Sequence, residues 1–100
     1  RLTLEIEAAA LPLLPGALAL AERFPSGGLK ANRRAFEARV EYRGTPGEAL
    51  RALLYDPQTS GGLLLLVPVA SVDALLAGMP FARRIGHSLP PRPQPLIVRA

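Results

Sequence analysis

The chain has 100 residues, of which 49% are apolar and 20% are charged, and its net charge is +4. This composition predicts a single folded domain over residues 1–100 and excludes intrinsic disorder, which requires low hydrophobicity and high net charge. The absence of cysteine excludes disulfides and cysteine-ligated metals, and a Ser-His-Asp triad would depend on His87, the one histidine. The aromatic content of 5% argues against a surface that stacks nucleic-acid bases.

Neither of the two longest uncharged stretches is expected to cross a membrane. Residues 8–21 and 57–72 are both shorter than the ~20 apolar residues that span a bilayer, and both contain proline. The first residues show no signal-peptide pattern, so we expect a cytoplasmic protein. The chain also begins without methionine, which is typical of a fragment or a processed chain.

The first half of the chain predicts two strands and two helices. Apolar and polar side chains alternate over residues 2–7, which predicts a half-buried strand with its leucines and isoleucine facing the core. Pro15 suits the first turn of a helix that runs to about Arg23. A second alternation, over residues 36–43, predicts another strand. The Thr-Pro-Gly-Glu sequence at residues 45–48 has the form of a capping box and predicts a helix that ends before Pro57.

The second half predicts three more strands and one helix. The continuous apolar run at residues 63–67 is typical of a strand covered on both faces, so we expect it in the middle of the sheet. Ser71 can cap a short helix that stops at Gly78. Residues 81–89 predict a weaker strand, and residues 96–98 predict a last strand at the sheet edge. This order of elements predicts an α+β fold, a mixed β-sheet with packed helices.

The loop at residues 56–62, Asp-Pro-Gln-Thr-Ser-Gly-Gly, is the most informative segment of the chain. We expect at least one of Gly61 and Gly62 to adopt positive φ, and the N–H groups and hydroxyls at Thr59 and Ser60 could hold an anion. The alternative is a tight connection in which Asp56 and Thr59 bond their own backbone. The loop has no lysine and precedes an expected strand, so it is not a P-loop.

Residues 56–63 closely resemble the signature of the selenophosphate synthetases, also called selenide, water dikinases. Two other segments agree with this resemblance. Residues 11–18, together with Gly27-Gly28 and Asn32, are similar to the segment that precedes the signature in that family, and Ile85-Gly86 resembles its Ile-Gly step near the C-terminus. The resemblance implies a C-terminal domain of the aminoimidazole ribonucleotide synthetase type, truncated at its N-terminal start.

The resemblance also implies a function for the parent enzyme, a phosphotransferase. Such an enzyme makes selenophosphate from selenide, ATP and water, releases AMP and phosphate, and uses magnesium. The family's catalytic cysteine or selenocysteine, its nearby lysine and its magnesium-binding aspartates belong to an N-terminal ATP-binding domain, so none maps onto this chain. We therefore expect the isolated chain to be inactive and its partners to be that domain and, in a homodimer, a second subunit.

The site implied within this chain is the loop of Thr59, Ser60, Gly61 and Gly62, facing a nucleotide ligand or the ATP-binding domain. A second hypothesis is a stand-alone, non-catalytic binding module or remnant with the same fold. A third is another enzyme of the superfamily, such as a thiamine-phosphate kinase relative, against which the run at residues 56–62 argues.

Two further features have competing interpretations. Half of the basic residues lie in a stretch of 21 positions: Arg23, Lys30, Arg33, Arg34, Arg39 and Arg43. They could form a surface that binds an anion such as phosphate or RNA, or a solvated face with local ion pairs. We expect the second. His87, next to Gly86, is interpreted as a surface or packed residue rather than a catalytic base.

Overall fold

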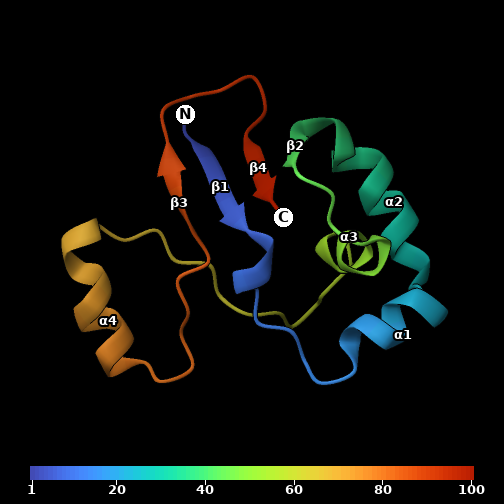
Figure 1. The fold of residues 1–100 in the computed structure, drawn as a ribbon, viewed down its shortest axis with the longest axis horizontal. Coiled ribbons are helices and arrows are strands. Elements are labelled where there is room, and N and C mark those ends of the chain that lie inside the picture. Colours follow the sequence, from blue (N-terminus) through green and yellow to red (C-terminus); the bar gives the residue numbers. More distant parts are fainter.

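The computed structural model describes residues 1–100 and has an α+β fold around one mixed sheet. The strand order is β2-β4-β1-β3, with β4 parallel to both of its neighbours and β3 antiparallel to β1 (Figure 1). The fold class predicted from the sequence is therefore confirmed. The strands are β1 (Thr3–Glu7), β2 (Val40–Arg43), β3 (Gly86–Leu89) and β4 (Leu96–Arg99).

Three of the four helices gather beside β2 and β4, whereas α4 lies alone beyond β3 (Figure 1). The α-helices are α1 (Ala17–Arg23), α2 (Gly27–Phe36), α3 (Glu48–Leu54) and α4 (Val72–Gly78). The 3₁₀ turns are η1 (Ala8–Ala10), η2 (Glu37–Arg39) and η3 (Val69–Ser71). The buried cluster of Leu29, Ala52 and Tyr55 packs against Val40 and Leu54, so the core lies between α2, α3 and β2. No helix combines the length and the apolar character needed to cross a bilayer.

Strand β4 lies inside the sheet, so its expected position at the edge is wrong. Its backbone pairs with β1 on one side and with β2 on the other. Ile97 and Val98 are completely buried. The short apolar run at residues 96–98 correctly predicts a strand, but its pairing partners are more than 50 residues away in sequence and leave no local signal.

In β1 the predicted strand is confirmed, but the predicted buried face is wrong. Thr3 and Glu5 are buried, whereas Leu4 and Ile6 are only half-buried. The Thr3 hydroxyl donates to a main-chain carbonyl (3.1 Å) and accepts from a main-chain N–H (2.8 Å), both in the proline-rich connector at residues 90–95. That connector covers the polar face of the strand, and satisfied hydrogen bonds make the burial of Thr3 tolerable.

The buried Glu5 carboxylate lies beside basic side chains from the other three strands. It lies 2.9 Å from Arg99 of β4, 3.3 Å from Arg43 of β2 and 3.5 Å from His87 of β3. A buried charge is stable only when it is paired in this way. The polar residues of β1 are therefore part of a charged sheet face rather than a solvated one.

The predicted central strand at residues 63–67 is wrong. These residues form no strand, and none of their backbone groups makes a hydrogen bond to another backbone group. Leu63 is 84% exposed and Leu65 is 45% exposed. The sheet interior is occupied instead by β1 and β4. An apolar run indicates that a segment can form a buried strand, but it does not determine which backbone the segment will pair with.

The remaining elements agree in part with the sequence predictions. Residues 36–43 do not form one strand, because α2 runs to Phe36 and η2 follows it, so only Val40–Arg43 is extended. Of residues 81–89 only Gly86–Leu89 forms a strand. The helices expected near residues 15–23, 45–55 and 71–78 are confirmed with shorter limits. The predicted capping box is wrong, because Gly47 occupies the N-cap position of α3 and no side chain caps this N-terminal end.

Candidate functional site

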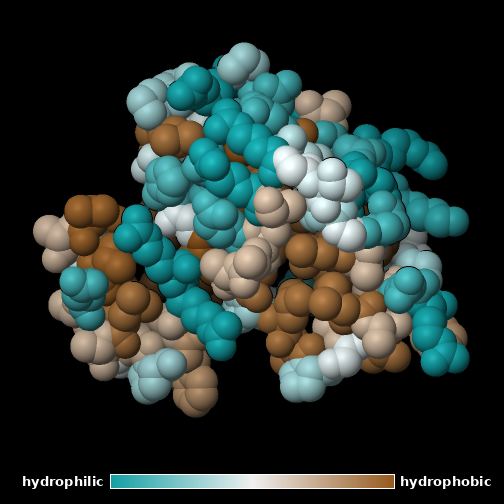
Figure 2. All heavy atoms as spheres, in the orientation of Figure 1, coloured by the Kyte–Doolittle hydropathy of each residue, from teal (hydrophilic) through white to brown (hydrophobic).

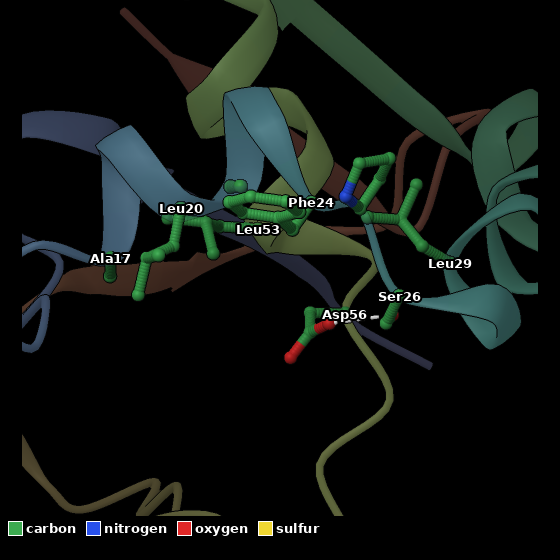
Figure 3. A pocket seen from close by; sticks show the side chains of 9 residues that line it. Ala17, Leu20, Phe24, Ser26, Leu29, Leu53 and Asp56 are labelled. Atoms are coloured by element: carbon green, nitrogen blue, oxygen red, sulfur yellow. Dashed lines mark hydrogen bonds between the residues drawn. The ribbon is translucent and has the colours of Figure 1, made fainter.

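Two of the segments that carry the family resemblance meet at the C-terminal end of α3. The Ser26 hydroxyl, just before α2, donates a 2.8 Å hydrogen bond to a carboxylate oxygen of Asp56 (Figure 3). The Asn32 side-chain amide donates a 3.0 Å bond to the main-chain carbonyl of Tyr55. Thus the Gly27-Gly28 and Asn32 segment is joined directly to the start of the loop at residues 56–62.

Gly28 makes the close approach of these two segments possible. A Cβ atom at this position would lie 2.8 Å from Cγ of Pro57, which is closer than real side chains allow. Gly27 has open space around the same position. The second glycine of the pair is therefore required by the packing of α2 against the loop, and the first is not.

The side chain of Asn32 provides a hydrogen-bond donor at the C-terminal end of α3. The last carbonyls of a helix lack partners within the helix and must find other donors. Helix α3 ends at Leu54, and the Asn32 amide supplies such a donor to the Tyr55 carbonyl that follows. The direction in which the chain enters the loop is thus set by a side chain that lies 23 residues earlier in the sequence.

An apolar hollow adjoins this junction, between α1, α3 and the start of α2. Its volume is about 190 Å³. Leu20, Phe24, Leu29 and Leu53 form most of its walls, and Asp56 lies at one end (Figure 3). Sites for small ligands have volumes of roughly 300–1,000 Å³, so the hollow fits a single side chain or small ring rather than a nucleotide.

The loop itself is exposed at all four residues of the predicted site: Thr59, Ser60, Gly61 and Gly62. The expectation of positive φ at one of the two glycines is wrong, because only Gly16 and Gly44 adopt it. The local-turn alternative is also wrong for Asp56, whose carboxylate accepts from Ser26 instead of its own backbone. The Thr59 and Ser60 hydroxyls make no hydrogen bond within the protein, which leaves them available to a ligand or another domain.

The basic stretch contains ion pairs, as the solvated-face interpretation expects. Arg33 contacts Glu37 at 3.1 Å and also binds Glu48. This guanidinium holds the pKa of the Glu48 carboxyl below its usual value, and the carboxylates raise the pKa of Arg33 in return. Arg43 likewise pairs with Glu41, at 2.8 Å. These two arginines are therefore already neutralised by neighbouring carboxylates.

The remaining titratable groups form no metal site. His87 is exposed on β3 beside Glu5, so of the two interpretations, surface residue or packed residue, the structure agrees with the first. No group of three or more His, Asp and Glu side chains lies close enough together to bind a metal ion. Sequence reasoning did not single out Ser26 or Tyr55. Ser26 could have been noticed because it immediately precedes the Gly27-Gly28 pair.

Among known proteins, the curated relatives that this chain resembles are selenide, water dikinases. No family model matches the chain. A selenide, water dikinase of Pseudomonas straminea is 44% identical over 66 residues, which is 65% of this chain and 18% of that protein. The selenide, water dikinase of Agathobacter rectalis is 32% identical over 97% of this chain and 30% of its own length. That of Clostridioides difficile is 37% identical over 77% of this chain and 22% of its own length.

The chain thus spans less than a third of the length of these curated relatives. The similarity nevertheless extends along nearly all of it. The two segments that these hydrogen bonds join include residues of the family resemblance, which are Gly27, Gly28 and Asn32 in one segment and the run from Asp56 onward in the other. The chain therefore belongs to the selenide, water dikinase family.

Proposed function

We propose that this chain is the C-terminal domain of a cytoplasmic, homodimeric enzyme that makes selenophosphate from selenide, ATP and water. ATP and magnesium would be bound by the N-terminal domain, and AMP and phosphate would be released. The observation that supports this proposal is the junction at the end of α3. There Ser26, Gly28 and Asn32 hold the start of the signature loop while its hydroxyls remain free.

The proposed role of the loop is to contact the nucleotide or the ATP-binding domain. Thr59 and Ser60 are exposed residues, and so are Gly61 and Gly62 beside them, which have no side chains to cover their backbone. Successive N–H groups in an exposed loop can bind the oxygens of a phosphate. Phosphoryl transfer also needs metal ions and cationic groups arranged around the phosphates. Because those are assigned to the N-terminal domain, the isolated chain should form no AMP from ATP, selenide and magnesium.

The loop's role is tested by removing each hydroxyl in the full-length enzyme. We expect Thr59→Ala and Ser60→Ala to reduce selenophosphate synthesis while leaving the urea unfolding of the isolated chain within ~0.5 kcal/mol of the parent. Thr45→Ala is the matched control, because Thr45 is also exposed and caps no helix. Loss of stability in proportion to activity, or equal activity in all three variants, would assign the loop a purely structural role.

A further inference from the structure

The hollow beside the junction of α3 and the signature loop presents apolar side chains to solvent. It lies between α1, α3 and the start of α2 and has a volume of about 190 Å³. Leu20 and Phe24, which form walls of the hollow on α1, are 58% and 69% exposed. Figure 2 shows apolar residues gathered over α1 and α3 on this face of the molecule. The hollow is therefore open to a ligand that brings apolar surface of its own.

The size of the hollow fits a ring with a short substituent. A dry cavity of about 150 Å³ lined by leucine, isoleucine and phenylalanine side chains binds benzene. The hollow is slightly larger and has similar walls, with Leu29, Leu53 and Phe24 among its lining residues. It thus has room for a benzene-sized body and a small polar group at one end.

The end of the hollow holds a carboxylate with unused hydrogen-bonding capacity. Asp56 is half-buried, and its side chain accepts one hydrogen bond, from the Ser26 hydroxyl at 2.8 Å (Figure 3). A carboxylate can accept about four. The ion pairs of the chain involve glutamates only, so no basic side chain neutralises Asp56. The guanidinium of Arg23, at the end of α1, lies over the Phe24 ring instead, 5.6 Å from its centroid.

We propose that the hollow is a binding site for a small organic cation, a primary ammonium ion attached to a benzene-sized apolar body. The apolar body covers Leu20, Leu53 and Phe24, and the ammonium group donates a hydrogen bond to the Asp56 carboxylate. Ser26 orients that carboxylate through its hydroxyl. An unpaired carboxylate attracts a cation and repels an anion, which decides the charge of the ligand. This inference is independent of the proposed enzymatic function, whose substrates include no organic ammonium ion.

The site is tested by titrating the 100-residue chain with benzylammonium chloride at neutral pH and following the amide chemical shifts by NMR. We expect the shifts to centre on Leu20, Phe24 and Asp56, with a dissociation constant of about 1–10 mM for so small a ligand. Benzyl alcohol has the same shape without the charge. It should bind at least about fivefold more weakly, because hydrogen bonds between charged groups are stronger than neutral ones. Benzoate, an anion, should not bind.

The role of the carboxylate is tested by Asp56→Asn, which keeps the shape of the side chain and removes its charge. We expect the dissociation constant for benzylammonium to rise at least about fivefold. Asp73→Asn is the matched control. Asp73 is exposed in the first turn of α4 and lies outside the hollow, so the same change of charge there should leave the constant as it is.

A second variant leaves Asp56 in place and fills the hollow. Ala21 lines the hollow, so Ala21→Phe should abolish binding, whereas Ala19→Phe, at an exposed position of α1 outside the lining, should not. The proposal is overturned by no response to benzylammonium, by equal affinity for benzyl alcohol, by an unchanged constant in Asp56→Asn, or by binding that Ala21→Phe retains. Tighter binding of a lysine capped at both ends would also overturn it, because the hollow would then belong to a side chain of a protein partner.

Discussion

At the scale of single residues, Tyr55 connects the core to the candidate site. Its side chain is buried beside Leu29 and Ala52, and its main-chain carbonyl receives the Asn32 amide. Its hydroxyl lies 2.8 Å from the hydroxyl of Tyr42. Burial is the main cause that raises the pKa of Tyr55 well above its ordinary value, and the hydrogen bond with Tyr42 adds to the effect.

We predict that Tyr55→Phe destabilises the chain by about 1 kcal/mol, the usual contribution of one hydrogen bond. The substitution removes the bond to Tyr42 and keeps the buried ring, so urea unfolding should show the loss without a change of fold. Tyr42→Phe serves as the companion variant. The double variant should cost less than the sum of the two single ones, because both remove the same bond. Strict additivity would show that the two hydroxyls do not interact.

The same residue predicts a pH dependence at the alkaline end. The pKa of Tyr55 is raised in the folded chain, so above about pH 10 the unfolded chain binds fewer protons than the folded one. The free energy of unfolding should therefore fall as pH rises beyond that value. Urea unfolding at pH 9 and pH 11 measures the effect. Tyr55→Phe should weaken this dependence, and an equally steep fall in that variant would assign it to other groups.

At the scale of elements, glycine placement decides how helices and strands approach one another. Gly28 brings α2 against Pro57. Gly86 does the same for β3, because a Cβ atom there would overlap the carbonyl oxygen of Glu5 on the neighbouring strand. In both places the missing side chain serves a contact between elements, rather than a special backbone conformation of the glycine itself.

The Gly27-Gly28 pair provides a matched test of this idea. Both residues lie in the first turn of α2, where alanine is intrinsically favoured over glycine by up to about 1 kcal/mol. Gly27→Ala should therefore be neutral or stabilising. Gly28→Ala should destabilise by about 1 kcal/mol or more, because its methyl group meets the Pro57 ring. Thermal unfolding compares the two, and an equal response of both variants would contradict the contact.

At the scale of the whole molecule, two apolar runs have exchanged the places that the sequence predicts. Residues 96–98, expected at the sheet edge, supply the fully buried Ile97 and Val98. Residues 63–67, expected in the sheet interior, are exposed. Stability should consequently depend on β4 far more than on the longer apolar run.

We predict that Ile97→Ala costs 2–5 kcal/mol of the free energy of unfolding, as buried large-to-small substitutions do. Leu65→Ala should cost less than about 1 kcal/mol, because Leu65 is already 45% exposed. Urea unfolding measures both. A large loss for Leu65→Ala would place residues 63–67 in the core.

The candidate site was predictable only as separate pieces. The sequence identifies the loop at residues 56–62 and, through resemblance, the Gly27-Gly28 and Asn32 segment. It does not show that Ser26 bonds Asp56, because the two residues are 30 positions apart and neither carries a local signal for the other. It also predicts the wrong conformation for the loop glycines, since the path of a loop depends on what its ends are attached to.

The sequence by itself determined the α+β class, three of the four helices and the existence of β1 and β4. These features follow from the spacing of apolar and polar residues within a few positions of one another. Helices and strands each place residues of a fixed spacing on the same face, so the spacing indicates which of the two forms. Only the tertiary structure decided that β4 is central, that Glu5 is buried among Arg99, Arg43 and His87, and that residues 63–67 pair with no strand. Strand pairing and burial are decided by contacts between distant segments, which compete for the same positions in the sheet.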